Sequence, residues 1–287
     1  MKKVYLVILT TVFFSSLLFA DGILMSWGMS DIKGMTKEKW DAARTWSVTE
    51  ILQNNINAES WADAYLAVVG ASQKKDSIID KLVDQLDNAS ITKLKLTNRL
   101  IIWERILSDD IIFEGEGFQV NDDLFSVAGR ANWILRNITK KNFGYIKPNS
   151  NGADLQALKN KWKQWREGRK IDEYVDPFES KEKGLDETHS LVAFEALIFS
   201  LKPSQKKDAI TRDCLKRVYQ LDEMPKEKGS SASYCNPDTY TFFFVSNLVG
   251  QKEIDESRDY AWWSKWWAEN KQKLVWNKEK GIFDVSK

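Results

Sequence analysis

Acidic side chains are concentrated between residues 109 and 123, and they are the first candidates for chemistry. Paired carboxylates can bind Ca²⁺ through their oxygens. They can also act as acid and base on a glycosidic bond when their environments separate their pKa values. Because acidic loops are usually solvated surface, we treat the first four only as candidate binding residues and assign no catalytic residue. The six residues are Asp109, Asp110, Glu114, Glu116, Asp122 and Asp123.

Tryptophan is the second unusual feature, since the chain has 13 of them. Trp262, Trp263, Trp266 and Trp267 occur together and form two i, i+4 pairs, which cover more than one face of a helix. An accessible tryptophan is a binding hot spot for a protein or a sugar. We take Trp263 and Trp267 as candidate binding residues, with burial in a helical core as the competing interpretation.

Common catalytic motifs are missing from the sequence, including G-x-S-x-G, H-E-x-x-H, the Walker loop and the EF-hand spacing. The only histidine is His189, which excludes most mechanisms that use His as a base or a zinc ligand. We interpret it as an ordinary residue at the start of a helix. The sequence therefore predicts a protein that is not an enzyme and that binds no metal or cofactor.

The N-terminus has the features of an export signal. Lys2 and Lys3 precede an uncharged apolar run over residues 4–20, and Asp21 and Gly22 follow it. This pattern predicts a secretory signal peptide over residues 1–20, removed in the mature protein. The alternative is a membrane anchor, for which about 17 apolar residues are marginal. We expect a periplasmic or secreted protein that has no membrane contact after cleavage.

The two cysteines, Cys214 and Cys235, fit an oxidising compartment. A disulfide between them would tie a helix to the loop that follows it, and two separate buried thiols are the alternative.

The overall charge limits the class of partner, because the chain has 42 Lys and Arg residues and 41 Asp and Glu residues. This balance argues against nucleic acid as the main partner, since nucleic acid binding requires a basic surplus.

Apolar residues recur with the period of a helix along most of the chain. A polar stretch over residues 168–184 divides the mature protein into region 1 (21–180) and region 2 (181–287), within one continuous domain or two. Residues 108–118 are expected to form an ordered loop with a short strand, and residues 274–285 a small β-hairpin. The expected helices are 36–52, 60–71, 75–86, 91–107, 122–138, 153–167, 187–201, 205–221, 238–249 and 257–271.

Three segments resemble the ends of bacterial HEAT-like repeat proteins. They are Gly129 to Leu135, Asn142-Phe143-Gly144-Tyr145 and Trp162-x-x-Trp165, and the motif Trp263-x-x-Trp266 repeats the last of these near the C-terminus. The resemblance implies an all-α chain of helical hairpins, arranged as a solenoid or an orthogonal array. It also implies a scaffold that holds a peptide or protein in a groove.

Two main functional hypotheses follow. The first is an exported module of the bacterial envelope that binds a protein or peptide, with an immunity or inhibitor protein as one form. The alternative is a carbohydrate-binding or carbohydrate-cleaving protein that uses surface tryptophans and the acidic loop; a structural envelope component is a third. A carboxylate pair facing a Trp-lined cleft would favour the carbohydrate hypothesis. A continuous groove with exposed aliphatic and Trp residues and without such a carboxylate pair would favour the binding module.

Overall fold

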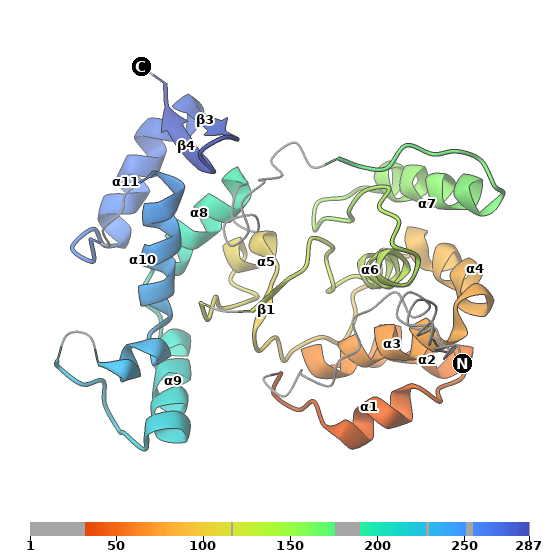
Figure 1. Ribbon diagram of the computed structural model, residues 1–287, viewed down its shortest axis with the longest axis horizontal. Coiled ribbons are helices and arrows are strands. Elements are labelled where there is room, and N and C mark those ends of the chain that lie inside the picture. Colours follow the sequence, from red (N-terminus) through yellow and green to blue (C-terminus); the bar gives the residue numbers. More distant parts are fainter. Residues whose placement is uncertain (1–31, 116, 176–189, 228–229, 251–254, 287) are drawn as a thin grey trace, which may run out of the picture.

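The computed structural model describes residues 32–115, 117–175, 190–227, 230–250 and 255–286 (Figure 1). The predicted signal peptide, Glu116 and His189 lie outside the described residues. The described part is mostly helical, with the small antiparallel hairpin that the sequence predicts at the C-terminus. The arrangement of its helices as HEAT-like repeats stays a prediction.

The first half is built around α3, a helix that is buried along nearly all its length. It packs against α1, α2, α4 and α6, and α7 packs against α4. Its helices are α1 (Lys37–Ala43), α2 (Val48–Asn57), α3 (Trp61–Lys74), α4 (Asp76–Asp84) with the 3-10 helix η1 (Gln85–Asp87), α6 (Val127–Thr139) and α7 (Gly152–Arg166).

The single helix predicted over residues 36–52 is wrong, because α1 ends at Ala43 and a second helix begins after its N-cap, Ser47. The Ser47 hydroxyl accepts a hydrogen bond from the Glu50 N–H, and the Glu50 carboxylate accepts one from the Ser47 N–H. This reciprocal capping box is a strong signal for a helix start. The sequence contained it inside the apolar stripe that suggested one continuous helix.

The helix predicted over residues 91–107 is also wrong for most of its length. Residues 91–97 form no helix and pair through isolated bridges at Ile91 and Leu96, and the Lys93 N–H donates to the Ile56 carbonyl at 3.1 Å. Burial alternates here, since Thr92 and Leu94 are buried whereas Lys93 and Lys95 are exposed. That is the period of a strand. The short strand β1 (Leu100–Ile101) then pairs in parallel with β2 (Phe118–Gln119), and only α5 (Trp103–Leu107) is helical.

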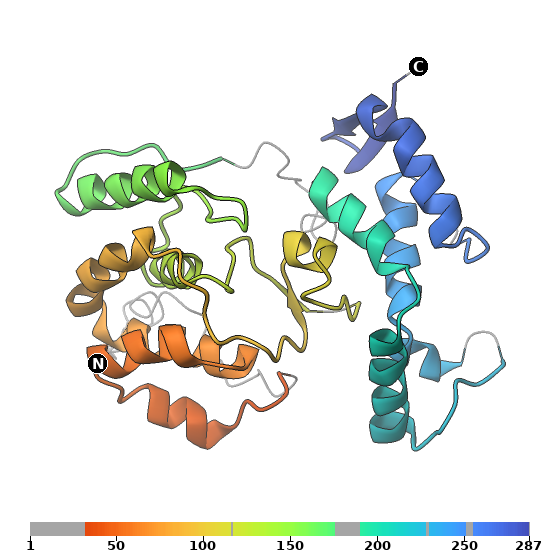
Figure 2. The same cartoon turned by 180° about the vertical axis from the view of Figure 1, so that it is seen from behind.

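The second half is organised around α8, which packs against α10 and α11 and also against α5 of the first half. Figure 2 shows from behind how α5 lies between the helices of the two halves. The elements are α8 (Leu191–Ser200), α9 (Gln205–Cys214), the π-helical turn η2 (Leu215–Tyr219), the 3-10 helix η3 (Ser231–Cys235), α10 (Pro237–Leu248), α11 (Tyr260–Asn270), the 3-10 helix η4 (Lys271–Lys273), β3 (Leu274–Asn277) and β4 (Ile282–Val285).

One apolar core crosses from the first half to the second. The ring of Phe113, in the loop after α5, lies 6.2 Å from that of Phe244 on α10. Further along, the Phe194 ring of α8 lies 5.1 Å from that of Trp267 on α11. The Phe113–Phe244 contact therefore packs aromatic rings across the seam between the halves, whereas the Phe194–Trp267 contact lies within the second half.

Candidate ligand cleft

A cleft of about 1020 Å³ lies between the two halves. One wall consists of the start of α1, the start of α3 and residues 95–99; the other consists of α9, η2 and η3. In Figures 1 and 2, α9 lies on one side and α1 and α3 lie on the other. Small-molecule pockets usually measure roughly 300–1,000 Å³, so this cleft is large enough for several side chains.

The first wall presents an exposed leucine on a fixed backbone. The Leu96 carbonyl accepts a hydrogen bond from the Trp61 N–H at 2.7 Å, and the Leu96 N–H donates to the Glu59 carbonyl at 2.9 Å. The side chain nevertheless remains 65% exposed. Because residues 59–61 hold both the N–H and the carbonyl of Leu96, its backbone is already ordered where the side chain lines the cleft.

The second wall is held by the disulfide between Cys214 and Cys235, which confirms the predicted pair. It joins the end of α9 to η3 and lines the cleft. Beside it lie two exposed side chains, Val218 (46%) and Tyr234 (37%). A small apolar cluster of Leu215, Ala232 and Cys235 backs this wall, separate from the main core.

A hydrogen bond joins the two walls, because the Arg99 guanidinium donates to the Tyr234 hydroxyl. Arg99 has a φ of 58°, in the left-handed region that few residues other than glycine adopt. Its carbonyl accepts a hydrogen bond from the Phe118 N–H at 2.8 Å. The β1–β2 pairing thus begins at the residue that reaches across the cleft.

Glu114 is the one residue of the acidic candidate set that lines the cleft among the residues described. The loop that carries Glu114 passes close to its neighbours at two glycines. A Cβ on Gly115 would lie 2.3 Å from the Tyr240 ring. A Cβ on Gly117 would lie 2.4 Å from the Arg99 carbonyl oxygen. Neither position has room for a side chain, so the Gly-x-Gly spacing is required for the loop to pass.

Burial raises the pKa of the Glu114 carboxyl above its ordinary value. The Asn98 amide opposes this by donating a hydrogen bond to the Glu114 carboxylate at 3.0 Å. The positive charges of Arg99 and Lys33 also lower the pKa of Glu114, but less than burial raises it. The cleft therefore contains a carboxyl group whose negative charge is disfavoured.

The other acidic candidates are dispersed. Asp109 is exposed and lies 3.7 Å from Lys206, and Asp110 lies 2.9 Å from an Arg105 nitrogen. Asp123 is buried and accepts two hydrogen bonds from the same arginine, at 2.8 and 2.9 Å. Within the described ranges no cluster of three or more His, Cys, Asp or Glu residues could hold a metal ion. Most of this loop thus forms structural ion pairs.

Asp122 shows the structural role most clearly, because its side chain is fully buried. It accepts hydrogen bonds from the Arg136 Nε at 2.9 Å, the Asn132 amide at 2.7 Å and the Ile146 N–H at 2.9 Å. A buried carboxylate with this set of donors is satisfied. It connects α6 to the loop that precedes α7.

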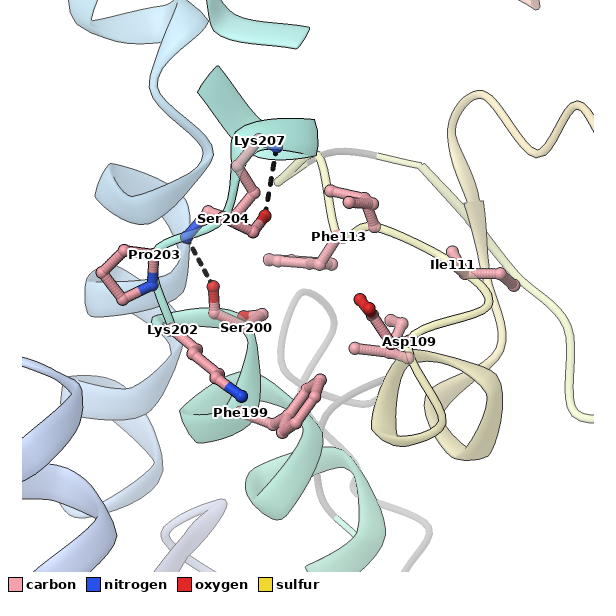
Figure 3. Close-up of a pocket in the computed structure, with 11 residues that line it drawn as sticks. Asp109, Ile111, Phe113, Phe199, Ser200, Lys202, Pro203, Ser204 and Lys207 are labelled. Carbon is pink, nitrogen blue, oxygen red and sulfur yellow. Dashed lines mark hydrogen bonds between the residues drawn. The ribbon is translucent and has the colours of Figure 1, made fainter. Parts of the chain in front are cut away.

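A second, smaller pocket of about 130 Å³ lies where the loop after α5 meets α8 and α9. Figure 3 shows the rings of Phe113 and Phe199 on two sides of it, with Asp109 at its edge. The Lys207 ammonium is buried here and donates to the Ser200 carbonyl at 2.6 Å and to the Asp238 carboxylate. Since its charge is already satisfied, this lysine offers nothing to a ligand.

Trp263 and Trp267 lie in the core, at 1% and 7% exposure. The Trp267 indole N–H donates to the Glu195 carboxylate at 2.9 Å. Both tryptophans are therefore core residues, as the competing interpretation predicted, and neither is an accessible binding residue. Their neighbour Trp262 is 39% exposed, with the Arg258 guanidinium 4.5 Å from its ring centre.

Leu96, Arg217, Val218 and Tyr234 are among the cleft residues that sequence reasoning missed. The pattern around Leu94 gives no signal for Leu96, because residues two apart share one face of a strand and Leu94 is buried, so alternation predicts a buried Leu96. For the other three the sequence carries no signal, since they line a cleft only when η2 and η3 face the first half.

None of the helices in the described ranges is long and apolar enough to cross a membrane. Comparisons of the chain with protein-family models, with curated proteins and with solved structures found no match.

Proposed function

We propose that this chain is an exported binding module and that its cleft holds a segment of a partner protein. The proposal rests on the cleft of about 1020 Å³, with Leu96 exposed on one wall and Val218 on the other. Exposed apolar side chains in a concave surface with a polar rim are typical of protein interaction sites. The disulfide in the wall supports a site in the periplasm or outside the cell, where disulfides persist.

The carbohydrate hypothesis receives less support. It requires carboxylates and tryptophans that face one cleft, but Asp63 lies 2.9 Å from Lys39, which neutralises its charge. The Trp61 side chain is only 1% exposed, so its ring is not available for stacking on a sugar. Trp263 and Trp267 lie in the core.

The proposal includes a helical-hairpin scaffold of the HEAT-like type. The support is a similarity between the two closing helices, α7 and α11. The Trp162 and Trp165 rings are 5.5 Å apart and nearly perpendicular, at 88°. The Trp263 and Trp266 rings are also 5.5 Å apart, at 73°. Equal spacing of equivalent residues is what duplication of a helical unit would leave.

A capture experiment tests the function. The chain from residue 21 onward, with its disulfide intact, is immobilised and exposed to envelope and secreted fractions of its own cells. Ala209→Trp fills the cleft, because Ala209 is exposed and lines it. Ala42→Trp is the matched control, on the exposed face of α1 and outside the cleft.

We expect one stoichiometric protein partner with the unaltered chain and with Ala42→Trp, and none with Ala209→Trp. If the chain is an immunity or inhibitor protein, the captured partner is a toxin or a cell-wall enzyme whose activity falls on binding. Retention on peptidoglycan or polysaccharide without any protein partner would contradict the proposal. Equal capture by both variants would show that the binding surface lies outside the cleft.

A further inference from the structure

Positive charge predominates in the lining of the cleft. Five lining residues are cationic and three are anionic. The cations are Lys33, Lys39, Lys95, Arg99 and Arg217, and the anions are Asp63, Glu114 and Asp213. A lining with this excess attracts negative charge into a space where water is partly excluded.

The pairing of these charges leaves some cations available. The Lys39 ammonium forms an ion pair with the Asp63 carboxylate at 2.9 Å. The Lys95 ammonium lies 3.7 Å from Glu59, but both side chains are more than half exposed, and such pairs contribute little. Arg217, on η2, is exposed and forms no ion pair with any residue that the structure describes. It is the clearest free cation of the lining.

Apolar side chains flank these cations on both walls. Leu96 directly follows Lys95, and Val218 directly follows Arg217, and both apolar side chains are exposed. Each wall therefore offers a cation next to an aliphatic contact. A ligand that uses both needs carboxylates close to apolar side chains.

Nucleic acid fits this surface less well than a peptide does. The chain as a whole has a formal net charge of only +1, and nucleic acid binding depends on a large basic surplus. Exposed aliphatic side chains such as Leu96 and Val218 have no matching group on a phosphate backbone.

We infer that the cleft selects an acidic protein segment in which carboxylates alternate with apolar side chains. The inference rests on the proposed function and names the chemistry of the partner. Arg217 and Lys95 hold carboxylates, while Leu96 and Val218 contact the apolar side chains.

The test uses fluorescein-labelled peptides of equal length with alternating Glu-Leu, Gln-Leu, Lys-Leu or Glu-Gly sequences. Binding to the disulfide-intact chain is measured by fluorescence anisotropy. We expect the Glu-Leu peptide to bind about tenfold more tightly than the Gln-Leu peptide, because two or three exposed charge contacts are lost. The Lys-Leu and Glu-Gly peptides should bind more weakly still, and added salt should reduce only the advantage of Glu-Leu.

Matched variants locate the effect in the cleft. Arg217→Gln should weaken Glu-Leu binding about threefold and leave Gln-Leu binding unchanged. Arg212→Gln is its control, an exposed arginine on α9 that does not line the cleft. Leu96→Ser should weaken both peptides, whereas Ile91→Ser should weaken neither, because Ile91 is 69% exposed but lies outside the cleft.

The outcomes separate this inference from the proposed function. Equal affinity for Glu-Leu and Gln-Leu, with both lost in Ala209→Trp, overturns the acidic preference and leaves protein binding in place. Binding of none of the peptides overturns the inference, while the capture experiment still decides the function. An Arg217-dependent affinity for oligothymidylate without affinity for Glu-Leu overturns it as well, and indicates a polyanion site.

Discussion

The Arg99 guanidinium donates a hydrogen bond to the Tyr234 hydroxyl, and this bond joins two residues that are 135 positions apart in the chain. Arg99 belongs to the first wall of the cleft, immediately before β1. Tyr234 belongs to the second wall, next to the disulfide-bonded Cys235. The bond adds a polar contact between the walls to the apolar packing of α5 on α8 and to the exposed Lys33–Asp213 pair at 3.9 Å.

Tyr234→Phe removes that contact and keeps the ring. We expect a loss of about 1 kcal/mol in unfolding free energy, measured by urea titration. We also expect a broader distribution of distances between spin labels placed on α1 and α9. Tyr219→Phe is the control, because the Tyr219 hydroxyl donates to the Ser231 carbonyl within the second wall. An unchanged distance distribution in Tyr234→Phe would show that the bond does not hold the walls together.

Replacing both Cys214 and Cys235 by serine should destabilise the second wall selectively. The disulfide closes a loop with a sequence separation of 21, for which the stabilisation is about 3 kcal/mol. The apolar cluster beside it is small and contains Leu215 and Ala232. Hydrogen exchange should show faster exchange of the amides in η2 and η3, with α3 and α6 unchanged. Uniform acceleration along the chain would refute this local role.

Glu114→Gln should have an effect on stability that depends on pH. The pKa of Glu114 is raised in the folded state by burial, so its contribution is fully present below the unfolded pKa and is lost as the pH rises through the folded value. The variant has no such loss. We therefore expect its unfolding free energy, relative to the unaltered chain, to be higher at pH 7 than at pH 4. A relative destabilisation at pH 7 would show that Arg99 and Lys33 outweigh burial.

Asp122→Ala should be strongly destabilising, because it leaves the Arg136 side chain with an unpaired and partly buried charge. The expected loss is about 3–5 kcal/mol. Asp110→Ala should cost less than about 1 kcal/mol, since Asp110 is 39% exposed at its side chain. Denaturant midpoints of the two variants measure the difference. Similar midpoints would mean that the acidic segment is not built around Asp122.

Trp263→Ala should cost about 3–5 kcal/mol, because it leaves a cavity beside Phe194 in the core. Trp262→Ala should cost much less, since Trp262 is exposed and contacts Arg258. Thermal unfolding monitored by circular dichroism compares the two. If Trp262→Ala abolished retention on polysaccharide with no change in stability, the carbohydrate hypothesis would gain its first support.

The amino-acid sequence by itself determined the features that depend on neighbouring residues. The helical spacing around α3, α8 and α11, the terminal hairpin of β3 and β4, and the pairing of Cys214 with Cys235 were all predictable. Local signals also existed where the predictions were wrong. The capping box at Ser47 and the alternation around Leu94 were present, but an apolar stripe with helical spacing obscured both.

Only the tertiary structure decided which side chains share the cleft. Residues 91–97 are not helical because carbonyls at Ile56 and Glu59 accept N–H groups of this segment, and a local pattern does not reveal such distant partners. The acidic residues separated because Arg105 and Arg136 neutralise three of them. Leu96 and Arg217 face the same cleft because packing of α5 on α8 sets the two halves against each other, and no short-range periodicity encodes that contact.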